Sequence, residues 1–238
     1  MARLARVVIP GMSHHVTQRG VRRLDVFRDD EDRLLYLKLF AQSAHSYELI
    51  VRCYTLMSNH VHFVVMPGRP DSIERVFHWC HGVYVEHFNE KYSLSGHLWE
   101  QRPHSCVLSD SHLREAVRYV ELNPVRARMV RRAADYRWSS ARAHCLGSVD
   151  PLLTGEDRLA IPAWAEWLEG QGYDLKVDEF LRTCTATGRP CGDDAFVRDL
   201  ERLTQRRLLP AKRGPKPKPR QTENLSFDWD GANGSESD

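Results

Sequence analysis

Two histidines separated by one valine, His60 and His62, interrupt an otherwise apolar segment that reads NHVHFVVMP. Alternate side chains of a β-strand share a face, so the two imidazoles would lie side by side, roughly 7 Å apart at the backbone. Two imidazoles at that distance can bind a single metal ion. They can also be half-buried histidines that bond to neighbouring groups, and the pair by itself does not decide between these interpretations.

A second set of reactive side chains lies in the segment SDSHLREAVRYVELN (109–123), whose apolar residues recur at the spacing of an amphipathic helix. Tyr119 lies on the flank of the apolar face, and Asn123 follows it by one turn, next to a proline that ends or redirects the helix. Arg118 and Arg126 flank the tyrosine and could hold a phosphate. A helical tyrosine is commonly a packing residue, so Tyr119 indicates catalysis only together with other evidence.

The elements that must position these residues alternate along the chain. The patterns predict strands at 14–20, at 48–57 and in the histidine segment, a bent strand or hairpin at 97–109, and helices at 29–47, 72–92 and 109–123. This order matches the split βαβ, ferredoxin-like arrangement with one added helix. The predicted fold class is α+β: a ferredoxin-like split βαβ sheet with helices on one face, plus a helical C-terminal extension. The two histidines would lie in the middle of the sheet, on the face that the helices cover.

Three regions are predicted along the 238 residues. Residues 1–148 would form the sheet domain and end in a basic helical segment at 124–145. Residues 149–209 would form the helical extension, interrupted at Gly172, Gly188 and Pro190. Residues 210–238 form a basic and then acidic tail that we expect to be disordered.

Composition sets the class of protein. An apolar content of 42% and a charged content of 28% are typical of soluble domains. No apolar run approaches the ~18 residues of a membrane helix, and the N-terminus lacks the apolar stretch of a signal peptide. The six cysteines form no C-x-x-C pair, so we expect reduced thiols and a cytoplasmic location without membrane contact. The net charge of +2 conceals a basic stretch, 202–220, that either contacts nucleic acid or is a solvated tail.

Several motifs together resemble one known family. PGMSHHVTQRG, VFRDDEDRLLYL, YTLMSNHVHFVVMP and RYVELNPVRARMV, in this order, resemble the REP-associated tyrosine transposases. These enzymes form part of the single-tyrosine branch of the HUH endonuclease superfamily, named for a histidine, a bulky apolar residue and a second histidine. The resemblance runs from about residue 8 to about residue 145, and it resumes at 185–197 and in the RRLLPAKRGPKPK arm.

The resemblance implies a role for each reactive residue. His60 and His62 would bind a divalent metal, Mg²⁺ or Mn²⁺, with Asn123 as a further ligand, and Tyr119 would be the nucleophile. Many relatives outside this branch have glutamine where this chain has Asn123, so this ligand departs from their pattern. The implied function is that of a transposase. It is a metal-dependent single-stranded DNA endonuclease and strand transferase that acts at palindromic repeat hairpins through a 5′-phosphotyrosine intermediate.

The implied partner is single-stranded DNA with hairpin repeats, and we expect a monomer or a weak homodimer. A plain solvated or ion-paired role is the alternative for every basic residue expected at the DNA. The candidate DNA-binding residues are Arg19, Arg22, Arg23, Arg118, Arg126, Lys212 and Arg213.

Two other functions remain open at this level. One is a non-catalytic repeat-DNA-binding protein of the same fold, which the presence of both histidines and Tyr119 disfavours. The other is a metal hydrolase acting on a small molecule, which the arginine-rich flanks disfavour. Tyr119 could work with the histidines of its own chain or with those of a partner.

Overall fold

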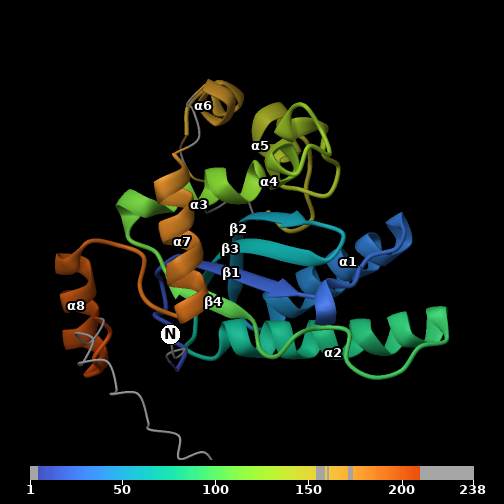
Figure 1. Ribbon diagram of the computed structural model, residues 1–238, viewed down its shortest axis with the longest axis horizontal. Helices are drawn as coiled ribbons and strands as arrows, with labels where there is room; N and C mark the ends of the chain where they lie inside the picture. Colours follow the sequence, from blue (N-terminus) through green and yellow to red (C-terminus); the bar gives the residue numbers. More distant parts are fainter. Residues whose placement is uncertain (1–4, 154–158, 160, 171–173, 210–238) are drawn as a thin grey trace, which may run out of the picture.

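The computed structural model describes residues 5–153, 159, 161–170 and 174–209 (Figure 1). At its centre lies a four-stranded antiparallel sheet with the order β2-β3-β1-β4. The strands are β1 (His14–Arg19), β2 (Leu49–Leu56), β3 (His60–Pro67) and β4 (His104–Val107). With β1 and β3 in the middle and a helix after β1 and after β3, this is the split βαβ arrangement. The predicted α+β class and ferredoxin-like sheet are confirmed.

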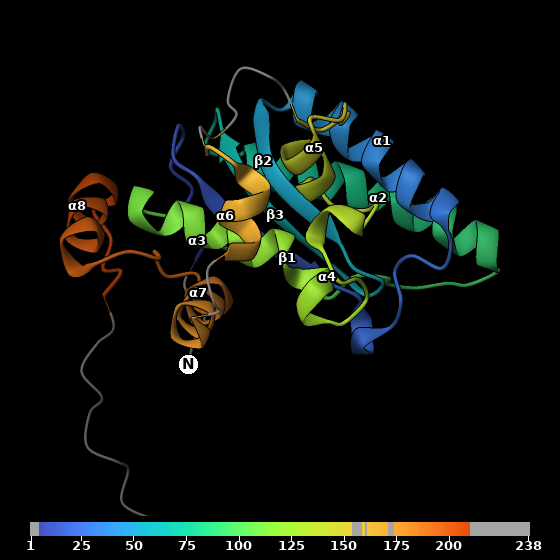
Figure 2. The same cartoon turned by 90° about the horizontal axis from the view of Figure 1, so that it is seen from above.

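Two helices cover one face of the sheet: α1 (Asp30–Ser46) and α2 (Ser72–Tyr92). They lie side by side beneath the strands, as Figures 1 and 2 show. Phe63 of β3 stacks on Phe40 of α1 with ring centroids 4.2 Å apart, and it meets Phe77 of α2 edge-on at 5.7 Å. These buried rings belong to the largest apolar cluster among the described residues.

The acidic residues at the start of α1 do more than complement the helix dipole. Asp29 and Asp32 form a capping box, in which each side chain accepts a hydrogen bond from the other residue's backbone N–H. Lys91, at the end of α2, donates to both carboxylates at 2.7 and 3.0 Å. The cap of α1 therefore also fastens α1 to α2.

The other face of the sheet is covered by α3 (Asp110–Glu121) and α7 (Leu175–Thr187). Figure 1 shows α3 above the sheet and α2 below it. The structure thus differs from the prediction in one respect, because helices lie on both faces. The helices of the two βαβ units are on the face away from the histidines, and α3 and α7 cover the histidine face. The cause is a second apolar surface on that face, which consists of Cys53, Val64 and Cys106.

The chain changes direction repeatedly after α3. Helix α4 (Asn123–Arg126) begins one residue before Pro124, the proline that was expected to end or redirect the helix that carries Tyr119. A 3₁₀ turn, η2 (Ala133–Asp135), and α5 (Ala141–Leu146) follow. The prediction of a helical segment at 124–145 is therefore wrong: Arg128 has a φ of +57°, a conformation outside the right-handed helix, and α4 ends before it.

In the described part of the predicted extension, the helices are α6 (Trp164–Gly170), α7 and α8 (Asp194–Thr204). Helix α7 ends at the predicted break, Gly188, which has a φ of +74°. Gly172 and the tail 210–238 lie outside the described residues. In the described part of the chain, no helix is long and apolar enough to cross a membrane.

A buried carboxylate fixes the end of α3. Glu121 is fully buried and accepts hydrogen bonds from the Ser140 hydroxyl at 2.6 Å and the Trp164 indole N–H at 2.8 Å. The Nδ1 atom of His144 lies 2.6 Å from the same carboxylate. Because Ser140 and His144 belong to the α5 segment and Trp164 to α6, Glu121 ties α3 to both.

His14 and His81 are buried histidines of the core that lie outside the histidine pair described above. His81 stacks on Trp99 with ring centroids 4.2 Å apart, and its Nε2 lies 3.0 Å from the Tyr36 hydroxyl. Burial lowers the pKa of His81 from 6.5 to about 3 and that of His14 to about 4. Both are neutral in the folded protein over a range in which the unfolded chain is protonated.

We therefore expect the free energy of unfolding to fall as the pH drops below 6.5, because the unfolded chain binds protons that the folded histidines do not. Each such group adds a slope of up to about 1.4 kcal/mol per pH unit until its folded pKa is reached. His81→Gln removes one group. Its loss of stability between about pH 7 and about pH 5, measured by urea unfolding, should be smaller than that of the wild type. An equal loss in both proteins would contradict this prediction.

Candidate active site

A cavity of about 440 Å³ lies at the histidine face of the sheet. Its lining includes all four residues predicted to carry the chemistry: His60 and His62 from β3, Tyr119 from α3 and Asn123 from α4. Further lining residues come from β1, β4, α4 and α7, and those used below are His15, Arg19, His104, Arg126, Arg182 and Thr185. The structure therefore brings the predicted tyrosine, histidines and asparagine of one chain into one cavity.

The sheet holds both histidines on a central strand. His62 pairs with Thr17 of β1 on one side and with Thr55 of β2 on the other, whereas His60 lies opposite Arg19. The two imidazole centroids are 5.0 Å apart, with their planes nearly perpendicular. Hydrogen-bonded neighbours on both sides make this strand a rigid support.

A neighbouring asparagine determines which nitrogen of His60 carries the proton. The Asn59 amide nitrogen donates to the Arg23 carbonyl at 3.1 Å, so the amide oxygen is the atom that lies 2.6 Å from His60 Nδ1. An amide oxygen can only accept, and His60 must therefore carry its proton on Nδ1. The lone pair is then on Nε2, which leaves that nitrogen able to bind a metal ion.

Burial keeps the two histidines in the neutral form. Burial, with a smaller contribution from the nearby Arg19 charge, lowers the pKa of His60 to about 4. Burial also holds the pKa of His62 well below its usual value, with smaller contributions from His60 and His15. Neutral imidazoles are the form that binds metal ions.

Tyr119 faces the histidines. Its ring lies edge-on to His62 with centroids 5.6 Å apart, and edge-on to His15 at 5.7 Å. The Arg126 guanidinium lies 3.9 Å from the centre of the tyrosine ring, and the guanidinium of Arg182 lies 5.6 Å from it. The tyrosine is thus held between imidazoles and guanidinium groups.

Arg126 is itself fixed by α7. One of its nitrogens donates to Asp178 at 2.8 Å, and another donates to the Tyr119 carbonyl at 2.8 Å. This arginine was predicted to contact DNA, and the structure places it in the cavity but pairs it with a carboxylate. It orients the tyrosine ring in addition to bringing positive charge to the cavity.

The donor set suits a divalent metal. The Asn123 amide nitrogen donates to the Tyr119 carbonyl at 3.2 Å, so its oxygen is the end free to bind a cation. Two imidazole nitrogens and one amide oxygen would leave open positions on the ion, as catalytic sites require. Among the described residues no three His, Cys, Asp or Glu side chains could hold a metal, and this set differs because its third member is an amide.

The structure places the other residues that were predicted to bind DNA in different surroundings. Arg19 lines the cavity, and Arg22 and Arg23 are exposed in the adjoining turn η1 (Val21–Arg23). Arg118 does not face the cavity: it is 7% exposed, and its Nε donates to the Leu168 carbonyl of α6 at 3.2 Å. The prediction that Arg118 binds DNA is therefore not supported, because its side chain lies in the contact between α3 and α6. Lys212 and Arg213 lie outside the described residues.

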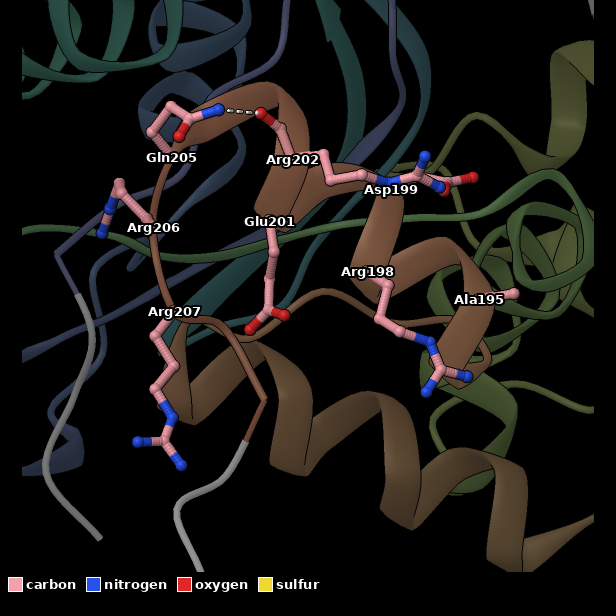
Figure 3. A pocket seen from close by; sticks show the side chains of 8 residues that line it. All are labelled: Ala195, Arg198, Asp199, Glu201, Arg202, Gln205, Arg206 and Arg207. Carbon is pink, nitrogen blue, oxygen red and sulfur yellow. Dashed lines mark hydrogen bonds and ion pairs between the residues drawn. The ribbon is translucent and has the colours of Figure 1, made fainter.

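The described part of the basic stretch forms a separate surface. Figure 3 shows Arg202, Arg206 and Arg207 around a cavity of about 650 Å³ beside α8. Arg202 pairs with Asp199, and Arg206 donates to the backbone carbonyls of residues 5 and 6. Within the described residues, this cavity and the candidate active site have no lining residue in common.

Sequence reasoning missed several residues of the cavity. His15 lies on the same face of β1 as Arg19, and the prediction of a strand at 14–20 contained a weak signal for it. His104 and Arg182 left no signal, and Thr185 was marked only as the first residue of the segment 185–197 in which the family resemblance resumes.

Comparison with known proteins gives one family match. Residues 9–123 match the family described as "Transposase IS200 like". A similar solved structure is that of a REP-associated tyrosine transposase bound to a REP hairpin, with 18% sequence identity and a TM-score of 0.50. The match covers 68% of this chain and 96% of that one, and at this identity it shows a common fold.

A second similar structure is a candidate transposase from Deinococcus radiodurans R1. It has 17% identity and a TM-score of 0.36, and the match covers 50% of this chain and 95% of that one. No curated protein matches the sequence.

Proposed function

From the premise that the domain at residues 9–123 belongs to the family of IS200-like transposases, we propose that this protein cleaves and rejoins single-stranded DNA through Tyr119. The observation that carries the proposal is the cavity in which Tyr119 and Asn123 meet the histidine pair of the same chain. The DNA-binding and catalytic roles of these residues are part of this proposal.

We propose hairpin-forming repeat DNA as the substrate. The similar structure described above is bound to a REP hairpin, and this chain has exposed arginines beside the histidine strand. Arg19 and Arg182 lie in the cavity, and Arg22 and Arg23 are next to it. Guanidinium groups bind phosphate oxygens in bidentate geometry, so these side chains are suited to position the backbone near the tyrosine.

A divalent cation, Mg²⁺ or Mn²⁺, would be held by His60, His62 and Asn123, and when bound it would offset negative charge on the scissile phosphate and on the departing oxygen. The residues of this chain prepare the site for it. Burial keeps the imidazoles neutral, and Asn59 directs the lone pair of His60 away from Nδ1.

Tyr119 would act as the nucleophile. Its phenol oxygen attacks phosphorus and loses its proton, while the bond from phosphorus to the 3′ oxygen breaks and that oxygen takes up a proton. The products are a 5′-phosphotyrosine and a free 3′ hydroxyl. The phosphotyrosine linkage retains the energy of the broken phosphodiester bond. Attack by another 3′ hydroxyl can therefore reverse the step and join two strands. Arg126 holds the ring in place during both steps.

Two labelled versions of one hairpin oligonucleotide test the proposal. With the full chain and Mn²⁺, a label on the 3′ side of the cut should migrate with the protein in SDS. A label on the 5′ side should be released as a shorter strand with a 3′ hydroxyl. Binding without any adduct would favour the non-catalytic repeat-binding protein. An adduct that carries the 5′ label would contradict the proposed polarity.

A further inference from the structure

A chain of three buried side chains leads from α7 to the histidine strand. The Thr185 hydroxyl of α7 lies 2.7 Å from His15 Nδ1, and His15 Nε2 lies 3.1 Å from His62 Nδ1. The two rings are parallel within 8°, with centroids 5.3 Å apart. Exposed fractions are 2% for Thr185, 1% for His15 and 6% for His62. These contacts join residues that are 170 and 47 positions apart in the sequence.

The proton positions along this chain follow from its first member. The Thr185 hydroxyl has one proton and also lies 2.8 Å from the Leu181 carbonyl, a group that can only accept. Both contacts are satisfied only if the hydroxyl donates to the carbonyl and accepts from His15. His15 must then carry its proton on Nδ1, and its Nε2 is an acceptor. His62 is consequently protonated on Nδ1, and its Nε2 has the lone pair.

We propose that His15 and Thr185 are positioning residues that hold His62 in the tautomer with a free Nε2. This inference rests on the proposed function, because a free Nε2 is useful at this cavity only if a cation binds there. His60 is held in the same tautomer by a separate partner, Asn59. Two independent contacts thus prepare both imidazoles in the same way, as second-sphere hydrogen bonds do in metal sites.

The inference makes α7 part of the active site. Thr185 lies beyond the region 9–123 that matches the family, and it reaches the histidine strand through His15. The Cys106 thiol lies 3.3 Å from the same hydroxyl and can donate to it. The donors and acceptors of the hydrogen bonds from Thr185 to His15 and from His15 to His62 then stay the same. If the Thr185 hydroxyl is replaced by an apolar group of equal size, His15 loses its hydrogen-bond acceptor, and the tautomers of His15 and His62 are no longer fixed.

The direct test is nuclear magnetic resonance of the full chain with ¹⁵N-labelled histidine, free of metal and DNA. The wild type should show His62 protonated on Nδ1 and bare on Nε2. Thr185→Val should shift His62 toward protonation on Nε2, and Thr185→Ser should keep the wild-type state. Thr187→Val is the matched control, since the Thr187 hydroxyl also bonds a carbonyl of its own helix, at 2.7 Å.

A wild-type His62 protonated on Nε2 would overturn the inference, and that measurement needs no variant to fold. An unchanged His62 state in a folded Thr185→Val protein would overturn it as well. The second readout is Mn²⁺ affinity of the DNA-free chain by titration calorimetry. We expect Thr185→Val to weaken binding about 10-fold or more, and Thr187→Val to leave it unchanged.

The two proposals fail in distinguishable ways. If the wild type forms the DNA adduct and Thr185→Val changes neither the tautomer nor the Mn²⁺ affinity, the positioning role is wrong and the proposed function stands. If the wild type neither forms an adduct nor binds Mn²⁺, but the His62 tautomer follows Thr185 as described, the hydrogen-bond chain holds and the proposed function is wrong.

Discussion

Tyr119→Phe is expected to abolish the covalent protein–DNA adduct and to slow strand cleavage by a factor on the order of 10⁴ to 10⁶, as when other enzymes lose their nucleophile. Phenylalanine has no oxygen to attack phosphorus, but it keeps the ring that meets His62 and the Arg126 guanidinium. We therefore expect hairpin DNA binding to change by less than about tenfold, a difference of about 1.4 kcal/mol. The measurements are single-turnover cleavage and a binding titration.

Tyr136→Phe is the matched control for this experiment. Tyr136 and Tyr119 are each 7% exposed, but the Tyr136 hydroxyl donates to the Leu56 carbonyl at 2.8 Å and does not line the cavity. This control should lose about 1 kcal/mol of stability and retain cleavage. Adduct formation by the Tyr119→Phe protein would show that another residue is the nucleophile.

His62→Ala is expected to reduce cleavage by a factor on the order of 10³, which corresponds to about 4 kcal/mol of lost transition-state stabilisation. His60→Ala should have a similar effect, because each substitution removes one of the two imidazole ligands. Removal of metal from the wild type with a chelator should give the same loss. Added Mn²⁺ or Mg²⁺ should restore activity to the wild type but not to either variant.

An exposed histidine of α2, His87, provides the control for the metal experiment. His87→Ala should cleave like the wild type and respond in the same way to chelation. Full activity of the wild type in excess chelator would show that cleavage does not need a metal, whatever the effect of the histidine substitutions.

Local patterns in the sequence were sufficient to predict the elements that carry the main site residues. The alternation in β3 predicted that His60 and His62 share a face, and the helical spacing of 109–123 placed Tyr119 one turn before Asn123. The family resemblance linked these two segments, and both lie in or at the end of the region, residues 9–123, that matches the IS200-like transposases. Such signals are local because strand and helix periods are properties of neighbouring residues.

What the sequence did not predict depends on distant contacts. The partnership of His15 and Thr185 spans 170 positions and follows no periodic pattern. Arg118 and Tyr119 are adjacent, yet one turns toward α6 and the other toward the histidines, since each helical residue is rotated by about 100°. Positive charge alone could not distinguish an arginine of the cavity from one that packs between helices.

The domain boundaries at 148 and 209 remain predictions. The structure adds that α7, from the region assigned to the extension, contacts β1 and β4 and contributes Arg182 and Thr185 to the cavity. A fragment that ends at residue 148 would lack these side chains. Biochemical work should therefore use the full chain.

The buried carboxylate of Glu121 has a consequence for how two DNA ends could be exchanged. It lies two residues after Tyr119 and is held by groups from two other helical segments. Swinging this end of α3 outward would separate the buried Glu121 carboxylate from its three hydrogen-bond partners, which is unfavourable because a buried polar group is left unsatisfied. If Tyr119 cuts and reseals DNA as proposed, it would therefore keep its place between the two steps, and the DNA strands would exchange around it.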